Sequence, residues 1–481
     1  MKVQLNNKDI VVYDTFVSKY PIDQVWNGYQ REKSQRSRAY FATFDIDGKS
    51  VLELKFTTKI VPDIRIRPGK LNLDFLKVDD FTLTMNLEKP CQFVVENGDE
   101  VIHVFCNEVF HYEQKSDDLY FGPGVHDVGV LALKSGQRVC LDEGAIVYGA
   151  IVGYKVENVE VVGRGILDSS KLLRLHEAKS DEPGGEVLNY FKGLGYGVKE
   201  VVVCGNLALW NCKNIKISGI ILVDSPSWSV ITRNGCKDIV FDNIKIVGQW
   251  RYNSDGIDIC TSENVLVQNC FVRSFDDCLV VRAPYLYGEN APCKKIRFEH
   301  CVLWCDWGKN LEIWCGEKEC VITDVLFEDL YLIKITHYAM SITTTYGSAS
   351  TRVKNIRYRN IFLDSDDFYP TPVMQKSKGE SIPVNSKSYD PVLLYISYGF
   401  LGRDLGNQKC EVATDRSRYN LCYENISFEN VRSGDRKFSI EIKADEPILA
   451  IKNLSFSMVD YQKMSFSSCL TKWMLTKGAF F

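Results

Sequence analysis

The chain has 481 residues, of which 45% are hydrophobic and 25% charged, and its 58 basic and 62 acidic residues give a formal net charge of −4. This length exceeds what one ordinary globular core accommodates, unless the fold is a repeat that grows along one axis. The lack of a Lys/Arg-rich block argues against a nucleic-acid or membrane-surface partner, and the lack of an 18-residue apolar run argues against a transmembrane helix.

The amino terminus and the cysteines bear on the cellular compartment. Residues 1–20 contain neither a long apolar core nor a small-residue cleavage site, so we expect a cytoplasmic protein, unless a leader has been trimmed. Several of the 17 cysteines lie inside apolar runs, and we interpret them as reduced, buried thiols rather than a disulfide framework. Cys301 and Cys305, beside His300, form only half of a zinc motif, so no metal or other cofactor is predicted.

Residues 1–115 are expected to form a β-sandwich. Short runs of alternating apolar and polar residues recur in this part, such as AYFATFDI and FTLTMNL, with Gly, Asp, Asn or Pro between them. Period-2 alternation is typical of strands, and no long helical periodicity competes with it. The boundary of this domain is predicted near residues 112–120.

Residues 116–481 carry a repeat with short alternating strands and no helix in the unit. One strand of each repeat begins its apolar alternation at an equivalent position, and these positions follow one another in steps of 24, 26, 31, 29, 31, 70 and 28. The residues are Ile215, Ile239, Val265, Ile296, Val325, Ile356, Ile426 and Leu454. Such a period, with Asn recurring at one corner, predicts a solenoid of the parallel β-helix type. Two insertions, near 169–209 and 366–420, are expected to be outer loops that wall a cleft.

Two acidic clusters on consecutive repeats mark a candidate catalytic site. Asp255 and Asp258 lie with Asn253 in NSDGID, and Asp276 and Asp277 lie in SFDDC, with 21 positions between Asp255 and Asp276. A single Asp on a solenoid face is usually only solvated, but crowded carboxylates raise at least one pKa. A protonated carboxyl beside an ionised one suits glycosidic-bond hydrolysis, because one protonates the leaving oxygen and the other activates water.

These motifs, with DSPSWSV before them, resemble the polygalacturonase family of pectinases (glycoside hydrolase family 28) and the similar dextranase and isopullulanase family (family 49). The resemblance covers roughly residues 120–460 and implies an all-β, right-handed parallel β-helix that hydrolyses with inversion. It implies that Asp276 is the general acid, and that Asp255 and Asp277 hold and deprotonate the attacking water. The β-rich amino-terminal domain is more similar to the family 49 arrangement.

The recognition motifs of pectinases are missing from this sequence. Their Gly-His-Gly is replaced by Gly308-Lys309-Asn310, and their Arg-Ile-Lys by a stretch without a cation between Met340 and Gly347. An acidic sugar would lose its counter-charge there. The resemblance therefore implies a neutral glycan, with an acidic one less favoured.

Further residues are predicted to bind the glycan. Lys309 and Glu312 are candidates to replace the missing His or to bind hydroxyls, unless both are exposed corner charges, and a lone His such as His337 is more often structural. Trp250 and Trp307 are candidates for stacking on sugar C–H faces, and Arg251 and Arg282 flank the acidic clusters. The full predicted set is Asn253, Asp258, Trp250, Arg251, Trp307, Lys309, Glu312, Arg282 and His337.

The predicted function is an inverting glycoside hydrolase that acts on an oligo- or polysaccharide without a cofactor. One alternative is a β-helix polysaccharide lyase, whose carboxylates would hold Ca²⁺ and whose base would be Lys or Arg. Another is a glycan-binding solenoid without catalysis. The sugar, its linkage, endo or exo action and the oligomeric state stay open.

Overall fold

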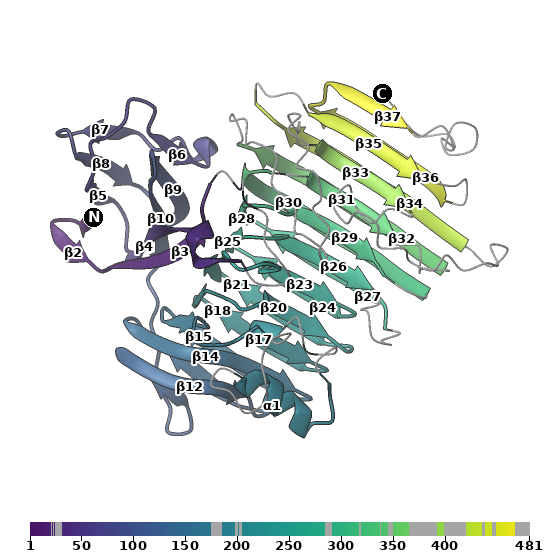
Figure 1. Cartoon of the computed structure of the whole chain (residues 1–481), viewed down its shortest axis with the longest axis horizontal. Helices are drawn as coiled ribbons and strands as arrows, with labels where there is room; N and C mark the ends of the chain where they lie inside the picture. The colour runs from purple at the N-terminus through teal and green to yellow at the C-terminus, as the bar shows by residue number, and fades with distance from the viewer. Residues whose placement is uncertain are drawn as a thin grey trace.

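The computed structural model describes residues 1–20, 22, 24, 31–174, 185–197, 201, 204–283, 291–316, 319–336, 338–344, 350–364, 392–398, 420–434, 438–444 and 449–466. They form an amino-terminal pair of small sheets that lies against the side of a long stack of parallel strands (Figure 1). Within these residues, no helix is long and apolar enough to cross a membrane.

The amino-terminal part is a sandwich of two five-stranded sheets. The first has the order β2 (Lys8–Ile10), β1 (Lys2–Leu5), β5 (Ser50–Lys55), β8 (Thr82–Leu87) and β7 (Phe75–Lys77). The second has the order β3 (Val12–Ser18), β4 (Arg36–Ile46), β10 (Glu100–Glu108), β9 (Cys91–Asn97) and β6 (Arg65–Arg67). Leu52 and Leu83 from the first sheet share one core with Phe93 and Val104 from the second, which confirms the predicted β-sandwich. Two short 3-10 helices, η1 (Lys33–Gln35) and η2 (Gly69–Leu71), complete this part.

The rest of the described chain is a parallel β-helix, as the repeat predicted. From β17 to β28 each coil contributes three strands, and each strand up to β27 pairs in parallel with the one three places later. In the later coils the second and third strands merge, because β30 pairs with both β27 and β28. The strands of this part are β11 (Leu119–Phe121), β12 (Gly124–Ala132), β13 (Arg138–Leu141), β14 (Ala145–Tyr154), β15 (Glu157–Gly163), β16 (Ile166–Asp168), β17 (Cys204–Trp210), β18 (Lys213–Ser218), β19 (Ile221–Val223), β20 (Trp228–Arg233), β21 (Lys237–Asp242), β22 (Lys245–Val247), β23 (Ile257–Cys260), β24 (Glu263–Gln268), β25 (Phe271–Ser274), β26 (Leu279–Ala283), β27 (Cys293–Glu299), β28 (Val302–Cys305), β29 (Leu311–Cys315), β30 (Glu319–Lys334), β31 (Tyr338–Thr344), β32 (Ser350–Leu363), β33 (Val392–Tyr398), β34 (Asn420–Arg432), β35 (Ser439–Ala444), β36 (Leu449–Val459) and β37 (Lys463–Phe466).

The register of the coils agrees with the repeat residue by residue. The eight equivalent repeat positions, from Ile215 to Leu454, are successive partners on the stacked strands. Asn at the corner adopts a left-handed φ, as at Asn214 and Asn264, and its side-chain amide donates to the residue one coil below. This ladder explains why the repeat keeps Asn or Asp at that place, because short polar side chains tolerate this backbone region.

The two insertions differ from their predicted extents. The first contains a helix, α1 (Glu186–Gly193), whose Phe191 packs on Trp210 with ring centroids 4.2 Å apart. It ends before Cys204, since β17 is already a coil strand, so the predicted end at residue 209 was too late. The second also contains a coil strand, β33, which pairs with β31 and β35. The rest of 366–419 lies outside the described residues.

The cysteines of the described chain are free thiols, and nearly all are buried. Many belong to the apolar core inside the solenoid, among them Cys236, Cys270, Cys278 and Cys301. The prediction of reduced thiols that pack as small hydrophobic side chains is therefore confirmed for these residues.

Candidate active site

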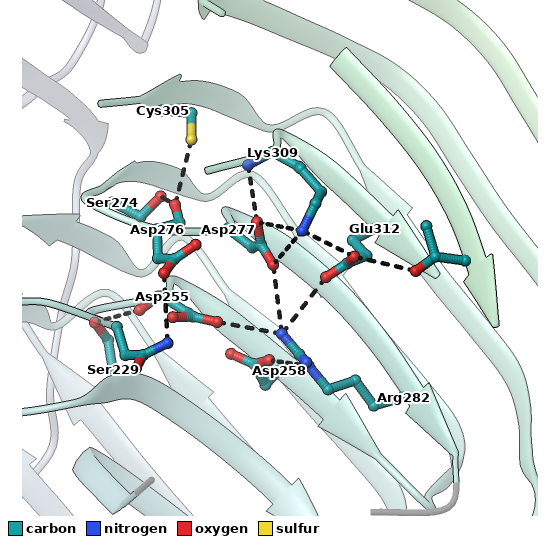
Figure 2. Close-up of polar contacts among 12 residues, drawn as sticks. Ser229, Asp255, Asp258, Ser274, Asp276, Asp277, Arg282, Cys305, Lys309 and Glu312 are labelled. Atoms are coloured by element: carbon teal, nitrogen blue, oxygen red, sulfur yellow. Dashed lines mark hydrogen bonds and ion pairs between the residues drawn. The ribbon is translucent and has the colours of Figure 1, made fainter. Parts of the chain in front are cut away.

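One corner of the solenoid gathers the predicted catalytic residues. It is the corner where the third strand of a coil ends and the first strand of the next begins. Asp255 precedes β23, Asp276 and Asp277 precede β26, and Lys309 precedes β29. Because β23, β26 and β29 pair in parallel, these residues come together on three consecutive coils (Figure 2).

Strand alternation directs further charged side chains out of the core at this corner. Ile257 and Ile259 of β23 lie in the solenoid core, so Asp258 between them projects outward. Asp258 is in register with Val280 of β26, and Val280 with Glu312 of β29. The carboxylates of neighbouring coils are thereby brought onto one face.

Two glycines let the backbone approach closely at this corner. A Cβ on Gly256 would lie 2.3 Å from the carbonyl oxygen of Cys278. A Cβ on Gly308 would lie 2.5 Å from Oδ1 of Asp276. A side chain at position 256 would therefore collide with the backbone of Cys278, and one at position 308 would collide with Asp276, because real Cβ atoms do not make such contacts.

Arg282 is the centre of the charged network. Its Nη2 lies 3.4 Å from Asp255 Oδ2, 3.4 Å from Asp277 Oδ2 and 3.5 Å from Glu312 Oε2. Its Nε lies 3.0 Å from Asp258 Oδ1. One guanidinium therefore contacts four carboxylates from three coils. We call Asp255, Asp258, Asp276, Asp277 and Glu312, with Arg282 and Lys309, the carboxylate cluster.

Aromatic rings flank the same guanidinium. The ring of Trp228 lies 4.6 Å from the Arg282 carbon Cζ, and the ring of Trp314 lies 5.3 Å from it. Planar guanidinium groups stack well on such rings. This packing fixes Arg282 and explains the presence of aromatic residues here without a bound sugar.

Lys309 is the second cation of the cluster. Its backbone amide donates to Asp277 Oδ1 at 2.8 Å, and its Nζ lies 3.5 Å from both oxygens of that carboxylate. The same Nζ lies 3.0 Å from Glu312 Oε1. Lys309 and Glu312 are thus not exposed corner charges, which was the alternative for them.

The two adjacent aspartates titrate in opposite directions. Burial and the charge of Asp277 raise the pKa of Asp276 well above its ordinary value, although Lys309 and Arg282 oppose this. Burial would also raise the pKa of Asp277, but Lys309, Arg282 and the hydrogen bonds it accepts outweigh burial and lower it to about 2. At neutral pH, Asp276 is therefore favoured as the protonated carboxylic acid and Asp277 as the carboxylate.

The other three carboxyl groups all have raised pKa values. Burial is the main cause at Asp255, where the carboxylates around it add to the rise. Burial also raises the pKa of Asp258 to about 8, against the charge of Arg282. For Glu312, burial and Asp277 raise the pKa to about 7. Five carboxyl groups around two cations cannot all be ionised, so the cluster retains protons at neutral pH.

Two carboxyl oxygens in the cluster are buried without a hydrogen-bond partner. They are Asp255 Oδ1 and Asp258 Oδ2, and the side chains of both residues are almost fully buried. Buried polar atoms usually have a partner in a protein or an ordered water. Asp255 Oδ1 thus offers an acceptor for a water molecule beside the two adjacent aspartates.

Three of the predicted glycan-binding residues, Asn253, Arg251 and Trp250, have different environments. Asn253 Nδ2 donates to Asp276 Oδ2 at 3.4 Å, so it contacts the cluster. Arg251 pairs with Asp224, with 2.9 Å from Nε to Oδ1, and not with the acidic clusters it flanks. Of the two arginines that flank the acidic clusters, Arg282 therefore pairs with their carboxylates, whereas Arg251 pairs with Asp224. The indole of Trp250 is 5% exposed, which leaves little of its face for a sugar.

The remaining candidates are Trp307 and His337. Trp307 stacks on Phe275 with a centroid distance of 5.5 Å and an interplanar angle of 2°, so one face of its ring is already covered. His337 lies outside the described residues. No group of three or more His, Cys, Asp and Glu in the described part of the chain is arranged to hold a metal ion.

One residue at the site was missed by the sequence analysis. Arg174 Nη2 donates to Asn253 Oδ1 at 2.9 Å, and its Nη1 donates to the carbonyl of Tyr252. It lies in the first insertion, where no periodicity marks individual residues. Only the spatial proximity of this insertion to NSDGID identifies it.

A known protein family matches the coils that carry this site. Residues 149–384 match the family model "Glycosyl hydrolases family 28", and the whole carboxylate cluster lies in that span. This region belongs to glycoside hydrolase family 28. The resemblance seen in NSDGID and the DD pair is thereby confirmed for the family 28 region.

Curated relatives match part of the chain. A probable rhamnogalacturonase A from Aspergillus oryzae is 26% identical over 186 residues, which covers 37% of this chain and 36% of the relative. An exopolygalacturonase from Cochliobolus carbonum is 24% identical over 228 residues, covering 39% of this chain and 49% of the relative. The chain thus spans between about a third and half of the length of these relatives.

A solved structure matches the whole architecture. The family 49 protein Dex49A from Penicillium minioluteum aligns with 99% of this chain and 93% of its own, with a TM-score of 0.61 and 13% sequence identity. The alignment includes the sandwich as well as the β-helix, which confirms the predicted fold and its likeness to the family 49 arrangement. At this identity the match concerns the fold alone.

Proposed function

We propose that the protein hydrolyses a glycosidic bond with inversion of the anomeric carbon, and that the carboxylate cluster is its active site. The observation that carries this proposal is that the pKa values of two adjacent carboxyl groups are shifted in opposite directions. Asp276 has a strongly raised pKa, and that of Asp277 is lowered to about 2. A pair of carboxyl groups whose environments separate their pKa values in this way supplies an acid and a base at one pH.

The roles follow from the protonation states. Asp276 donates its proton to the oxygen of the leaving sugar, as its raised pKa favours. Asp277 is ionised and removes a proton from the attacking water. Asp255, whose own pKa is raised, holds that water through its unpartnered Oδ1 rather than deprotonating it. Lys309 and Arg282 keep Asp277 ionised while the substrate displaces solvent.

A neutral sugar at the scissile bond is part of this proposal. Both cations of the cluster already contact its carboxylates, so neither is free to bind a sugar carboxylate. The described strand β31, where pectinases would carry their Arg-Ile-Lys, contains only neutral residues. Ser341 is in register with Glu312 on the outward face and offers a hydroxyl there instead.

The deciding experiment follows the anomer of the product by NMR, on a panel of glucan, galactan, fructan and pectic oligosaccharides. Inversion is expected at the first turnover, and a retained anomer would contradict the mechanism. A polysaccharide lyase would instead release an unsaturated product that absorbs in the ultraviolet and would lose activity with a chelator. A purely glycan-binding solenoid would bind members of the panel without releasing any product.

A further inference from the structure

A cavity of about 400 Å³ lies where the sandwich meets the β-helix. Sites for small molecules have volumes of about 300–1,000 Å³, so this cavity has room for one or two sugar units. Lys33 and Arg36 line it from the sandwich, and Asp168, Lys171, Arg174 and Arg251 line it from the β-helix. We call this cavity the junction pocket.

The junction pocket continues the corner that carries the carboxylate cluster. The strands β16, β19, β22 and β25 stack in parallel, and the chain leaves each of them at this corner. Asp168, Asp224 and Arg251 lie at or after the ends of the first three strands and line the pocket. Asp276 and Asp277 follow the fourth. A glycan chain along this row of corners would therefore pass from the cluster into the pocket.

Two hydrogen bonds join the wall of the pocket to the predicted general acid. Arg174 lines the pocket and donates from Nη2 to Asn253 Oδ1 at 2.9 Å. Asn253 in turn donates from Nδ2 to Asp276 Oδ2 at 3.4 Å. The pocket is thus next to the cluster.

The lining of the pocket has more cations than carboxylates. The cations are Lys33, Arg36, Lys171, Arg174 and Arg251, and the carboxylates are Asp14, Asp168 and Asp224. Of these, Arg251 pairs with Asp224, and Lys171 with Asp127 outside the lining.

Arg36 and Lys33 keep their charges available. Within the described residues, neither forms an ion pair with a carboxylate. The Arg36 guanidinium lies 3.6 Å from the ring centroid of Phe16 and 5.1 Å from that of Trp250, so aromatic packing holds it in place. Held guanidinium groups bind carboxylates strongly, because little freedom is lost on binding.

From this charge distribution, we propose that the junction pocket binds a carboxylate-bearing sugar unit of the glycan that is cleaved at the carboxylate cluster. This inference rests on the proposed function. It defines the substrate class as an oligosaccharide with a neutral unit at the scissile bond and an acidic unit nearer the amino-terminal coils. Arg36 and Lys33 bind the carboxylate, and Asp168 accepts from sugar hydroxyls.

Binding is best measured without turnover, in the Asp276→Asn protein by calorimetry. The probes are oligosaccharides that contain galacturonate, glucuronate or mannuronate units, each paired with its carboxyl-reduced counterpart. We expect at least one acidic probe to bind about tenfold or more tightly than its reduced counterpart, as a charge-assisted contact implies. Adding Arg36→Gln or Lys33→Gln removes that preference. Lys49→Gln, an exposed substitution on the sandwich, is the matched control and keeps it.

Each further outcome has a defined meaning. Equal binding of every acidic probe and its reduced counterpart would overturn the inference, as would an unchanged preference in both pocket variants. Lys33 is exposed, so Lys33→Gln keeps the test open if Arg36→Gln does not fold. The proposed function fails separately, if the wild-type protein binds these probes and the glucan, galactan and fructan oligosaccharides but hydrolyses none of them.

Discussion

Two buried groups of charged side chains differ in whether carboxyl groups or cations are in excess. The carboxylate cluster has five carboxyl groups and two cations. The second group lies where the sandwich contacts the β-helix and has one carboxylate among His103, Arg273, Asp306 and Lys334, which we call the interface cluster. Asp306 Oδ2 lies 3.3 Å from Arg273 Nε, and its Oδ1 lies 3.3 Å from Lys334 Nζ and accepts from Trp304 Nε1 at 2.8 Å.

The pKa values follow this difference in balance. In the interface cluster, the two cations outweigh burial and lower the pKa of Asp306, and burial with Arg273 lowers that of His103 to about 3. The Asp306 carboxylate is therefore ionised and the His103 imidazole is neutral. Both oxygens of the carboxylate have a cationic partner. In the carboxylate cluster, several pKa values are raised into or above the neutral range. Equal burial thus gives an ionised carboxylate where cations are in excess and a group that holds protons where carboxylates are in excess.

The largest expected effect comes from removing the proton of Asp276. Asp276→Asn keeps the shape of the neutral carboxyl group but has no proton to donate, so kcat is expected to fall about 10²–10⁴-fold. The melting temperature should hardly change, because the wild-type group is already uncharged. Release of reducing sugar measures the rate, and calorimetry the stability. A variant that retains near wild-type kcat would remove Asp276 from the role of general acid.

In the interface cluster the matching substitution should affect stability instead. Asp306→Asn leaves Arg273 and Lys334 buried without their carboxylate, and breaking such a pair costs about 3–5 kcal/mol. Asp258→Asn is the comparison, since Arg282 keeps three other carboxylates and a smaller loss is expected. Urea unfolding of both variants measures the difference. Equal losses of stability would show that the two clusters do not differ as their charge balance implies.

The pH dependence of stability should also carry the signature of the carboxylate cluster. The pKa of Glu312 is about 7 in the folded protein, above the ordinary value of 4.5. The folded state therefore binds this proton more tightly, and the stabilisation is complete below about pH 4 and is lost as pH rises through 7. The loss is on the order of 3 kcal/mol for such a shift. Unfolding by urea at several pH values should show a shallower decline in Glu312→Gln, and an unchanged slope would contradict the raised pKa.

The sequence was sufficient for the repeat and for the acidic clusters. The solenoid register was predictable because Ile215 and its counterparts recur with an Asn or Asp corner, which local steric rules impose. The strand that carries Asp258 was not recognised as part of the unit, since β20, β23 and β26 follow turns of unequal length. The partners of Arg251 and the contacts of Arg174 depend on the path of the first insertion. Long-range contacts of that kind leave no periodic pattern.

Lys309 tests the origin of the low pKa of Asp277. Lys309→Met removes the ammonium group but keeps the backbone amide that donates to Asp277 Oδ1 at 2.8 Å, and Arg282 stays 3.4 Å from Oδ2. The pKa of Asp277 should therefore rise only in part, by about one unit. Since the base must be ionised, the acidic limb of the pH–rate profile should move to higher pH by about the same amount.

The control for this shift is Lys295→Met, which removes an exposed lysine that lies 3.8 Å from Glu263 on a neighbouring strand. Its pH–rate profile should coincide with that of the wild type. A fall in kcat without a shift of the acidic limb in Lys309→Met would mean that Lys309 positions the loop but does not set the charge of Asp277. A shift with little loss at the optimum would instead identify Lys309 as the residue that keeps the base ionised in place of the missing pectinase histidine.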